Sequence, residues 1–290
     1  MSFLQIMILA LVQGAAELLP VSSSAHVIVA EKLMGLNPVS PEMTLLLVML
    51  HTGTMFAVLI YFWNSWKKYF FQSSGSLKEF VVYIVVATGF TGVVGLTLKF
   101  IIEKVFLSDM PHAEIELIFG NTNLMTVSLL AVGLLIVYAG LKKQNKGGFS
   151  SLDLAKSSLI GVVQGVCLPF RGFSRSGATI SVGLTMGVNK EKLEAFSFAL
   201  AVVLTPPVIV REVLRLLKAS ESQAATVVAK TGLAQLLLPG VLGMVLSFCA
   251  GLLALRWLSS WLEKGRWQVF GYYCIGASIV IFLLQRSGYL

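Results

Sequence analysis

Two short polar segments interrupt otherwise apolar sequence, and they hold most of the residues that could do chemistry. The first runs from Glu17 to His26, and the second runs from Gly172 to Thr179. Glu17 is the only formally charged side chain in residues 1–30. A charged side chain near the centre of a bilayer costs about 2.5–3.5 kcal/mol on insertion scales. Glu17 therefore predicts a bound metal, another cation or a proton relay; the alternative is a carboxylate near the membrane surface that reaches water.

Arg175 presents the opposite charge in the second segment, between Ser174 and Ser176 and with apolar sequence on both sides. Its guanidinium carries a planar fork of donors that suits phosphate oxygens. The alternative is a purely structural ion pair between Arg175 and Glu17. Arg171 adds a second positive charge four residues earlier, and it binds at the same place or faces the adjoining loop.

The hydroxyl and imidazole groups of these segments offer further chemistry. Capping of a helix is the default role of each serine, and ligand or nucleophile is the alternative; the serines are Ser22, Ser23, Ser24, Ser174 and Ser176. Ser23 is the preferred candidate for a covalent role. His26 could act as a general acid or base, because histidine titrates near neutrality and because Ser23 and Glu17 are close in sequence. A structural histidine is the alternative, and His51 and His112 are weaker candidates.

Both segments also supply backbone groups that attract anions. Each begins a new helix at a corner rich in serine or glycine, where free amides and the positive end of the helix dipole point into the site. Two such helix starts and Arg175 predict an anion pocket. Glu17 suits that pocket only if a divalent cation lies between the carboxylate and the anion, as Mg²⁺ or Ca²⁺ can. The residues therefore predict a site for a phosphate or diphosphate with a metal.

The elements that must position these residues are membrane helices. Hydrophobic residues make up 56% of the chain and charged residues 12%, whereas soluble domains carry about 25% charged residues. Six apolar runs reach or approach the roughly 20 residues of a spanning helix: Met43–Phe62, Val81–Lys99, Asn123–Gly140, Phe196–Leu214, Leu233–Leu255 and Phe270–Leu284. A transmembrane barrel would show short alternating segments instead. The net charge of +8 lies in short loops, so we expect it to set topology and expect no nucleic-acid partner.

The two polar segments resemble each other, which predicts an internal repeat. Val12-Gln13-Gly14 matches Val163-Gln164-Gly165, and Ser23 matches Ser174 in the same register. In each segment an apolar run is broken by proline or glycine and hydroxyl residues before it resumes, and Pro20 cannot continue a helix. Such a pattern predicts a hairpin that enters and leaves the membrane on one side. Paired breaks of this kind are typical of a binding site near the bilayer midplane.

The predicted fold is therefore an all-α polytopic membrane protein with six transmembrane helices plus two re-entrant helical hairpins. Residues 1–290 form one membrane domain, in which residues 1–150 and residues 151–290 are inverted repeats.

Loop charges predict how this domain is oriented. Three loops on one side are basic: residues 63–80, 141–156 and 256–268. On the other side, residues 101–120 carry four acidic residues and one lysine. This bias is typical of a cytoplasmic and an external face, and it places the mouth of the first hairpin outside and that of the second inside. Arg215, Lys218 and Lys230 oppose the pattern, because they would lie outside.

Other features of the sequence are less informative. Cys167, Cys249 and Cys274 lie in apolar segments without CxxC spacing, so we expect buried free thiols and no disulfide or metal site. The first apolar run lacks the marks of a cleaved signal peptide and is expected in the mature protein. Pro206-Pro207 interrupts a span, either as a kink or as the wall of a groove for a lipid chain.

The motifs resemble those of the undecaprenyl-diphosphate phosphatase family, the bacitracin-resistance membrane phosphatases. The Glu/Gln-x-x-x-Glu motif of that family is similar to Gln13–Glu17, and its Leu-Pro-Val-Ser-Ser sequence with a following His is similar to Leu19–Ser23 and His26. Its Pro-Gly-x-Ser-Arg-Ser-x-x-Thr motif matches Gly172–Thr179 in all but its first position, where Arg171 stands in place of proline. The arginine in place of proline leaves the shape of the local turn and the substrate preference open.

The resemblance implies an integral enzyme of the bacterial inner membrane that hydrolyses undecaprenyl diphosphate to undecaprenyl phosphate and inorganic phosphate. Its product would be the lipid carrier that peptidoglycan synthesis reuses, and its activity would confer bacitracin resistance. The resemblance also implies dependence on a divalent cation and a site toward the external, periplasmic face. The expected partners are a polyprenyl diphosphate lipid and membrane lipids, and a homodimer is left open.

The resemblance further implies a role for each site residue. The expected catalytic residues are Glu17, Ser23, His26 and Arg175, with Glu17 also the metal ligand. The expected substrate-binding residues are Gln13, Ser22, Ser174, Ser176 and Thr179. By this carry-over Glu17 and Gln13 serve the metal or the attacking group, while Ser174, Arg175 and Thr179 hold the diphosphate.

A transporter or flippase of a polyprenyl phosphate lipid is the alternative function. Inverted repeats with broken helices suit alternating access as well as they suit catalysis. Release of free phosphate from a lipid diphosphate with Mg²⁺ would distinguish the enzyme from a carrier. A purely structural membrane protein agrees poorly with charges at Glu17 and Arg175 inside apolar sequence.

Overall fold

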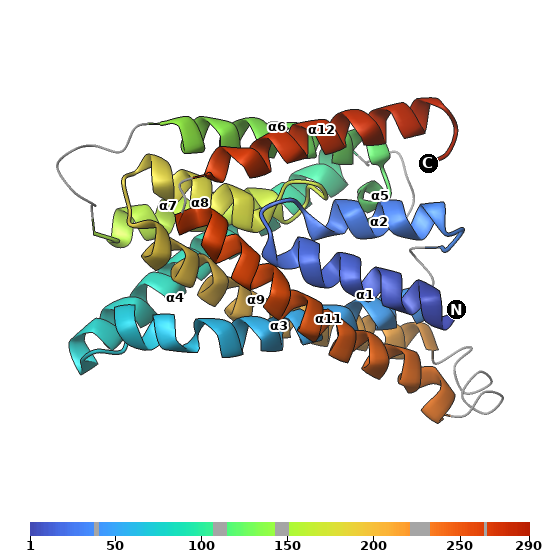
Figure 1. Ribbon diagram of the computed structural model, residues 1–290, viewed down its shortest axis with the longest axis horizontal. Coiled ribbons are helices and arrows are strands. Elements are labelled where there is room, and N and C mark those ends of the chain that lie inside the picture. The colour runs from blue at the N-terminus through green and yellow to red at the C-terminus, as the bar shows by residue number, and fades with distance from the viewer. Residues whose placement is uncertain (38–40, 107–114, 143–150, 221–232, 264–265) are drawn as a thin grey trace.

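The protein is a bundle of long, roughly aligned helices (Figure 1). The computed structural model describes residues 1–290 except 38–40, 107–114, 143–150, 221–232 and 264–265. Within the described part, six helices are long and apolar enough to cross a membrane. They are α3 (Pro41–Tyr69), α4 (Ser74–Ile101), α6 (Thr122–Leu141), α9 (Lys190–Ser220), α11 (Leu233–Glu263) and α12 (Trp267–Arg286). The predicted all-α polytopic fold is confirmed.

The spanning helices extend beyond the apolar runs that predicted them. Helix α3, for example, continues past Phe62 to Tyr69. The added turns carry lysines and aromatic residues, and the ammonium of Lys67 lies 5.3 Å from the ring centroid of Trp63. Aromatic and basic side chains of this kind suit the interface between hydrocarbon and water. The apolar run of the sequence therefore ends before the helix does.

Two pairs of shorter helices lie within the bundle: α1 (Phe3–Leu18) with α2 (Ser23–Leu33), and α7 (Leu154–Cys167) with α8 (Arg175–Thr185). Helices α1 and α2 start from the end that holds both chain termini and turn back near the middle of the molecule (Figure 1). Helices α7 and α8 do the same from the opposite end. Entry of each pair into a membrane and exit on the same side stays a prediction.

Local sequence explains both turns. Helix α1 ends at Leu18 because Pro20 has no amide to continue the ladder, and Ser22 then adopts a φ of 68°. The second turn contains Gly172 with a φ of 96°, which only glycine adopts without strain. Ser174 then caps α8, since its Oγ accepts a hydrogen bond of 3.2 Å from the amide of Gly177.

The Val-Gln-Gly repeat packs in the same way in each half. A Cβ on Gly14 in α1 would lie 2.7 Å from the carbonyl oxygen of Ser247 in α11. A Cβ on Gly165 in α7 would lie 2.9 Å from the carbonyl oxygen of Thr91 in α4. Both glycines therefore allow a close helix contact, and each hairpin packs on a span of the other half. This correspondence agrees with the predicted division at residue 150, which stays a prediction.

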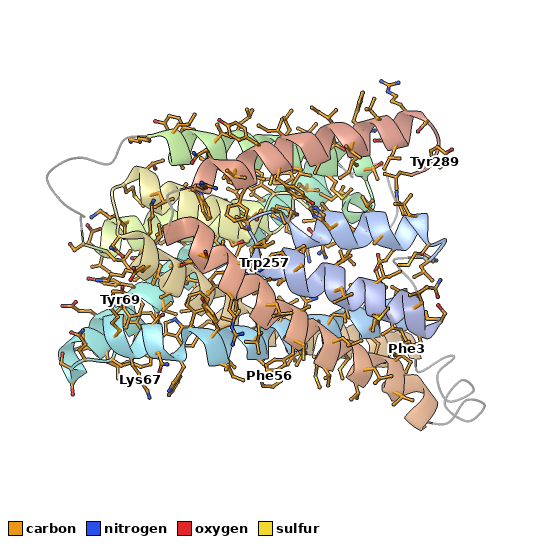
Figure 2. All side chains as sticks on the ribbon, in the orientation of Figure 1. Phe3, Phe56, Lys67, Tyr69, Trp257 and Tyr289 are labelled. Carbon is orange, nitrogen blue, oxygen red and sulfur yellow. The ribbon has the colours of Figure 1, made fainter. Side chains whose placement is uncertain are left out.

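The remaining described elements lie toward the ends of the bundle. The π-helix η1 (Ile102–Phe106) extends α4, and the single turn α5 (Glu116–Phe119) precedes α6. Helix α9 runs through Pro206 and Pro207 without a break. Figure 2 shows Lys67 and Tyr69 at one end of the molecule, and Phe3 and Tyr289 at the other.

Candidate active site

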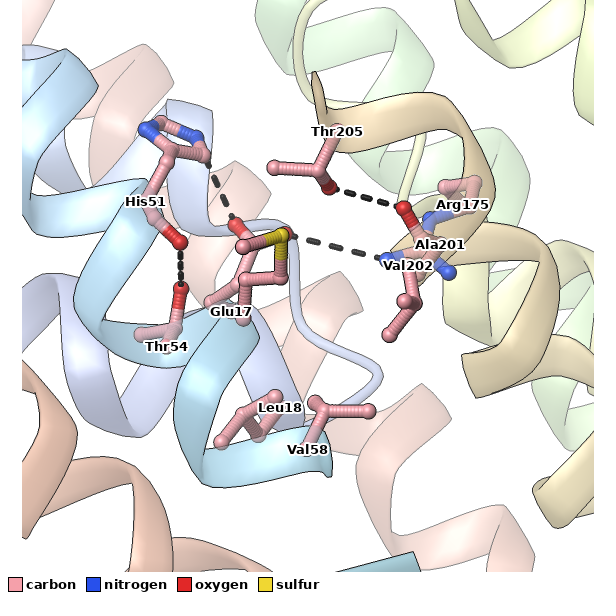
Figure 3. A pocket seen from close by; sticks show the side chains of 10 residues that line it. Glu17, Leu18, His51, Thr54, Val58, Arg175, Ala201, Val202 and Thr205 are labelled. Atoms are coloured by element: carbon pink, nitrogen blue, oxygen red, sulfur yellow. Dashed lines mark hydrogen bonds and ion pairs between the residues drawn. The ribbon is translucent and has the colours of Figure 1, made fainter. Parts of the chain in front are cut away.

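Glu17 and Arg175 meet inside the bundle. Glu17 lies in the last turn of α1, and Arg175 is the first residue of α8. The Oε1 atom of Glu17 is 3.7 Å from Nη2 of Arg175, and their side chains are only 21% and 20% exposed. Neither charge therefore lies in bulk water, as the sequence predicted, and the pair joins the two polar segments (Figure 3).

The other carboxylate oxygen of Glu17 faces three polar groups from three helices. Ser23 Oγ donates a 2.5 Å hydrogen bond to Oε2, and Gln13 Nε2 donates one of 3.1 Å. The Nε2 atom of His51, in α3, lies 3.7 Å from the same oxygen. Glu17 is thus the centre of a cluster that unites Gln13, Ser23, His51 and Arg175.

The orientation of His51 follows from its backbone contact. Its Nδ1 atom is 2.8 Å from the carbonyl oxygen of Leu47, and a carbonyl oxygen can only accept, so Nδ1 must carry a proton. Neutral His51 therefore presents a lone pair of Nε2 toward Glu17, and protonated His51 presents an N–H group. The sequence alone makes His51 a weaker candidate than His26. The signal that could have raised it is the run from His51 to Thr54, which is polar inside a membrane span.

Arg175 is held in place from α9. Its Nη1 atom donates a 3.1 Å hydrogen bond to the carbonyl oxygen of Ser197. The hydroxyl of Thr179 lies 2.7 Å from the hydroxyl of Ser197 and donates to the carbonyl oxygen of Arg175 at 2.8 Å. Thr179 and Ser197 are completely buried. In this arrangement Thr179 supports the start of α8 and the guanidinium that projects from it. Its partner Ser197 was not predicted, because it lies within an ordinary apolar span.

A pocket adjoins the charged cluster, between α3 and α9 (Figure 3). The lining residues are Glu17, Leu18, His51, Thr54, Met55, Val58, Arg175, Ala201, Val202 and Thr205. The pocket therefore has an acid, a guanidinium and an imidazole on one part of its wall and aliphatic side chains on another. Such a surface suits an anionic head group attached to an apolar chain.

Three predicted substrate-binding serines occupy structural positions. Ser174 caps α8 through its Oγ. Ser22 Oγ lies 3.3 Å from Ser24 Oγ. Ser176 is 4% exposed, and its carbonyl oxygen accepts from the hydroxyl of Thr179 at 3.4 Å. None of these three serines lines the pocket that the described residues form, and their roles toward substrate stay predictions.

His26 is directed toward α12. Its Nδ1 atom lies 2.8 Å from the carbonyl oxygen of Ser22, and its Nε2 atom lies 2.8 Å from the hydroxyl of Tyr273. The two rings are stacked, with centroids 5.6 Å apart. These contacts separate His26 from the cluster around Glu17, and its predicted catalytic role stays a prediction.

The donor atoms around Glu17 fit a hard cation. Gln13 Oε1 is buried and has no hydrogen-bond partner among the described residues, although its side chain bonds to Glu17 through Nε2. Oxygen from a carboxylate, an amide and the hydroxyl of Ser23 is what Mg²⁺ and Ca²⁺ prefer. In the described part of the chain no group of three or more His, Cys, Asp or Glu side chains could hold a metal. A cation held by Glu17 would take its remaining ligands from phosphate and water.

Comparison with known proteins agrees with this chemistry. Residues 6–280 match the family described as Bacitracin resistance protein BacA. The chain is 55% identical over 284 residues to Undecaprenyl-diphosphatase 2 of Acinetobacter baylyi, and the match covers 98% of each chain. It is 30% identical over 289 residues to Undecaprenyl-diphosphatase of Bacteroides thetaiotaomicron, which covers 98% of this chain and 100% of the relative. The Undecaprenyl-diphosphatase of Parabacteroides distasonis is also 30% identical, over 97% of both chains.

Proposed function

The chain belongs to the Bacitracin resistance protein BacA family, and we propose that it hydrolyses undecaprenyl diphosphate to undecaprenyl phosphate and inorganic phosphate. The observation that carries this proposal is the pairing of Glu17 with Arg175 beside a pocket with apolar walls. The relatives are named as phosphatases of this lipid, so the carrier alternative is not favoured. The product is a lipid carrier available for another round of peptidoglycan synthesis, and bacitracin resistance agrees with the family name.

Arg175 binds the phosphate that is transferred. Its Nη1 atom is fixed by the carbonyl oxygen of Ser197, while Nη2 is directed toward Glu17 at 3.7 Å. That separation is longer than a hydrogen bond, so the guanidinium keeps donors for phosphate oxygens. Charge that develops on these oxygens in the transition state is then met by a cation already in position.

Glu17 accepts the proton of the attacking oxygen. Ser23 Oγ already donates to Glu17, which is the contact of a nucleophile with its base. Attack on the terminal phosphorus forms one phosphorus–oxygen bond and breaks the bond to the bridging oxygen, which leaves on the lipid monophosphate. If Ser23 attacks, water then releases phosphate from its Oγ; if water attacks, Ser23 orients it. His51 can take the proton from Glu17 through Nε2, which faces the carboxylate.

A divalent cation, Mg²⁺ or Ca²⁺, completes the proposal. Glu17 and the Oε1 atom of Gln13 are the groups that would hold it. Gln13 Oε1 is buried without a hydrogen-bond partner in the described part of the chain, and the same side chain contacts Glu17 through Nε2. When bound, such a cation would supply positive charge to the phosphate oxygens. Without it, Glu17 would repel the diphosphate.

We place the enzyme in the bacterial inner membrane, as a multi-pass protein, on the evidence of six apolar helices and the family. The loop charges support a site reached from the external, periplasmic side. This side is also the one on which a phosphatase would meet carrier lipid that has delivered its glycan.

The test of this proposal is phosphate release by purified protein in detergent with undecaprenyl diphosphate and Mg²⁺. We expect Glu17→Gln and Arg175→Ala each to lower kcat by at least about a hundredfold, because each removes a charge that acts on the reacting group. Glu191→Gln is the matched control, since Glu191 lies with Lys68 at the basic end of the bundle. Wild-type activity in both site variants would refute the assigned roles.

A further inference from the structure

The turn between α1 and α2, residues 19–22, carries backbone groups that the two helices cannot satisfy. The last carbonyl groups of a helix have no partner within that helix. Inside a membrane they need donors from elsewhere in the protein, because lipid supplies none. Ser22 in this turn also has a φ of 68°, which residues other than glycine rarely adopt, so surrounding contacts must hold it there.

Helix α12 reaches this turn at two adjacent residues. The Sγ atom of Cys274, which is completely buried, donates to the carbonyl oxygen of Pro20 at 3.5 Å. The hydroxyl of Tyr273 lies 2.8 Å from Nε2 of His26. The Nδ1 atom of the same imidazole lies 2.8 Å from the carbonyl oxygen of Ser22. The rings of His26 and Tyr273 are stacked, with an interplanar angle of 13°, so α12 holds the turn directly at one carbonyl and through His26 at the other.

The carbonyl of Ser22 sets the direction of the hydrogen bonds that end on it. A carbonyl oxygen can only accept, so Nδ1 of His26 must carry a proton. In the neutral imidazole Nε2 is then an acceptor, and the hydroxyl of Tyr273 donates to it. Without that donor the other tautomer becomes accessible, in which Nδ1 has only a lone pair for the carbonyl oxygen. Tyr273 therefore favours the tautomer of His26 that holds Ser22.

The held carbonyl lies next to the reacting groups. Ser22 and Ser23 share a peptide bond, and that bond is planar, so the carbonyl of Ser22 sets the orientation in which the backbone of Ser23 begins. Ser23 Oγ in turn donates the 2.5 Å hydrogen bond to Glu17. A continuous series of contacts therefore runs from the hydroxyl of Tyr273 to the carboxylate of Glu17.

We propose that His26 and Tyr273 are positioning residues, which hold the Ser22 carbonyl and thereby aim the hydroxyl of the next residue at the catalytic acid. The proposal rests on the roles assigned above to Ser23 and Glu17. His26 acts in this way through Nδ1 and the backbone, and its Nε2 atom is occupied by Tyr273 instead of substrate.

Two amide replacements of His26 separate this role from acid–base catalysis. The amide nitrogen of asparagine lies near the position of Nδ1, whereas that of glutamine lies near the position of Nε2. We expect His26→Asn still to donate to Ser22 and to keep kcat for phosphate release within about fivefold of wild type. His26→Gln should lower kcat by about thirtyfold or more with little change in KM, because the reacting groups lose alignment while Arg175 still binds phosphate.

Tyr273→Phe keeps the stacked ring and removes the donor to Nε2. We expect kcat to fall by about tenfold, again with little change in KM. In the His26→Asn background the same change should alter kcat by less than about twofold, since no imidazole tautomer remains to be selected. Tyr272→Phe is the matched control and should keep the wild-type kcat: it removes a hydroxyl from the next residue of α12, and the described residues offer that hydroxyl no hydrogen bond.

The experiment measures kcat, KM and Tm for each variant of the full chain with undecaprenyl diphosphate and Mg²⁺, at a temperature well below each Tm. Equal kcat in His26→Asn and His26→Gln, whether both are active or both inactive, would overturn the proposal, because Nδ1 would then have no special part. So would a kcat of Tyr273→Phe within about twofold of wild type. Failure of the proposed site is a separate result, because it is read from Glu17→Gln and not from these variants.

Discussion

At the scale of residues, the site rests on opposite charges that apolar surroundings force together. Each charge alone would be costly inside a membrane, and each is met by its partner at 3.7 Å. This distance is short enough for the opposite charges to reduce that cost, but it is too long for a strong hydrogen bond. Glu17 and Arg175 can therefore exchange partners when a diphosphate enters, which a tight bidentate pair would resist.

His51 gives the first prediction at this scale. His51→Gln should lower kcat by about a hundredfold, because it removes the imidazole Nε2 that faces Glu17 while keeping a polar side chain. Phosphate release with saturating lipid diphosphate measures the effect. Thr52→Ala is a neighbouring control, since the hydroxyl of Thr52 bonds to the carbonyl oxygen of Val48. If kcat of His51→Gln stays within about twofold of wild type, His51 has no part in proton transfer.

Ser23 gives the second prediction at this scale. If the oxygen of Ser23 attacks phosphorus, Ser23→Ala should abolish turnover. Wild-type enzyme that is quenched during turnover should then carry phosphate on Ser23. Mass spectrometry of the quenched enzyme detects this phosphate. Ser158→Ala is the control, because the hydroxyl of Ser158 is exposed and donates only to the carbonyl oxygen of Leu154 in its own helix. Retention of about a tenth of kcat in Ser23→Ala would instead make water the attacking group.

The sequence predicted the site residues that carry a charge within apolar sequence. It did not predict the residues that reach the site only through packing of the folded helices. Glu17 and Arg175 stood out because a charge in apolar sequence demands a partner wherever the chain goes. His51 and Ser197 belong to ordinary apolar spans, and only the packing of α3 and α9 brings them to the site. Thr179 was predicted from its motif, but its burial against Ser197 could not be seen in one dimension.

At the scale of elements, the tight turns decide whether the two polar segments can meet. Gly172 has a positive φ of 96°, and a Cβ there would lie 2.3 Å from the carbonyl oxygen of Met125. We expect Gly172→Ala to lower both Tm and kcat, because it adds a clash to backbone strain. Gly35→Ala is the control: Gly35 has a φ of 69° with nothing within 4 Å of a Cβ. Gly35→Ala should lower the free energy of unfolding only by the backbone strain, about 1–2 kcal/mol, and should leave kcat unchanged. If Gly35→Ala and Gly172→Ala lower kcat equally, the second turn has no special role.

The start of α7 gives a prediction about pH. Asp153 caps this helix, and the pKa of its carboxyl lies below the ordinary value because Lys156 donates hydrogen bonds to it from its ammonium and its amide. A lowered pKa means that the carboxylate stabilises the fold fully above about pH 4, and that this contribution disappears as pH falls through the folded-state pKa. Asp153→Ala should therefore lower stability by about 1 kcal/mol at neutral pH.

Thermal unfolding of wild type and Asp153→Ala across pH measures this effect. The difference in Tm should be constant from neutral pH to about pH 5 and shrink below about pH 4. Asp153→Asn should keep part of the cap and show a smaller difference at neutral pH. A difference in Tm that grows on acidification would contradict the assigned cause.

Helices were predictable because long apolar runs have few other solutions in a membrane. Their ends were not, since lysines and aromatic residues prolong helices such as α3 beyond the apolar window. The packing partners of the helices were not predictable either. Nothing in the apolar runs shows that α1 packs along α11 or that α7 packs along α4. Those contacts depend on small residues such as Gly14 and Gly165 meeting a particular backbone.

At the scale of the whole molecule, both termini lie at the same end of the bundle (Figure 1), and the proposed orientation puts that end outside. Ser287→Cys, in a chain whose three natural cysteines are replaced, should react with a membrane-impermeant maleimide added to intact spheroplasts. Ser74→Cys should react only after lysis. Both serines are exposed, so the comparison isolates the side of the membrane. The reverse pattern of labelling would invert the proposed topology.

The two halves contribute unequally to the chemistry. In the register of the repeat, Leu168 corresponds to Glu17 and Ser24 corresponds to Arg175. Each half therefore has a close glycine contact, at Gly14 or Gly165, while the acid of the site belongs to the first half and the guanidinium to the second. The ion pair of the site, Glu17 with Arg175, joins an acid of the first hairpin to a base of the second.

This division has a consequence for biogenesis. A ribosome delivers the first half to the membrane before Arg171 and Arg175 have been synthesised. During that interval Glu17 must enter hydrocarbon uncharged or wait at its surface, since an ionised carboxylate without a partner is too costly there. Because the acid and the guanidinium that line the pocket come from different halves, the pocket can assemble only after the second half has been inserted. A nascent chain that stops before residue 175 lacks the guanidinium that Glu17 meets in the folded protein.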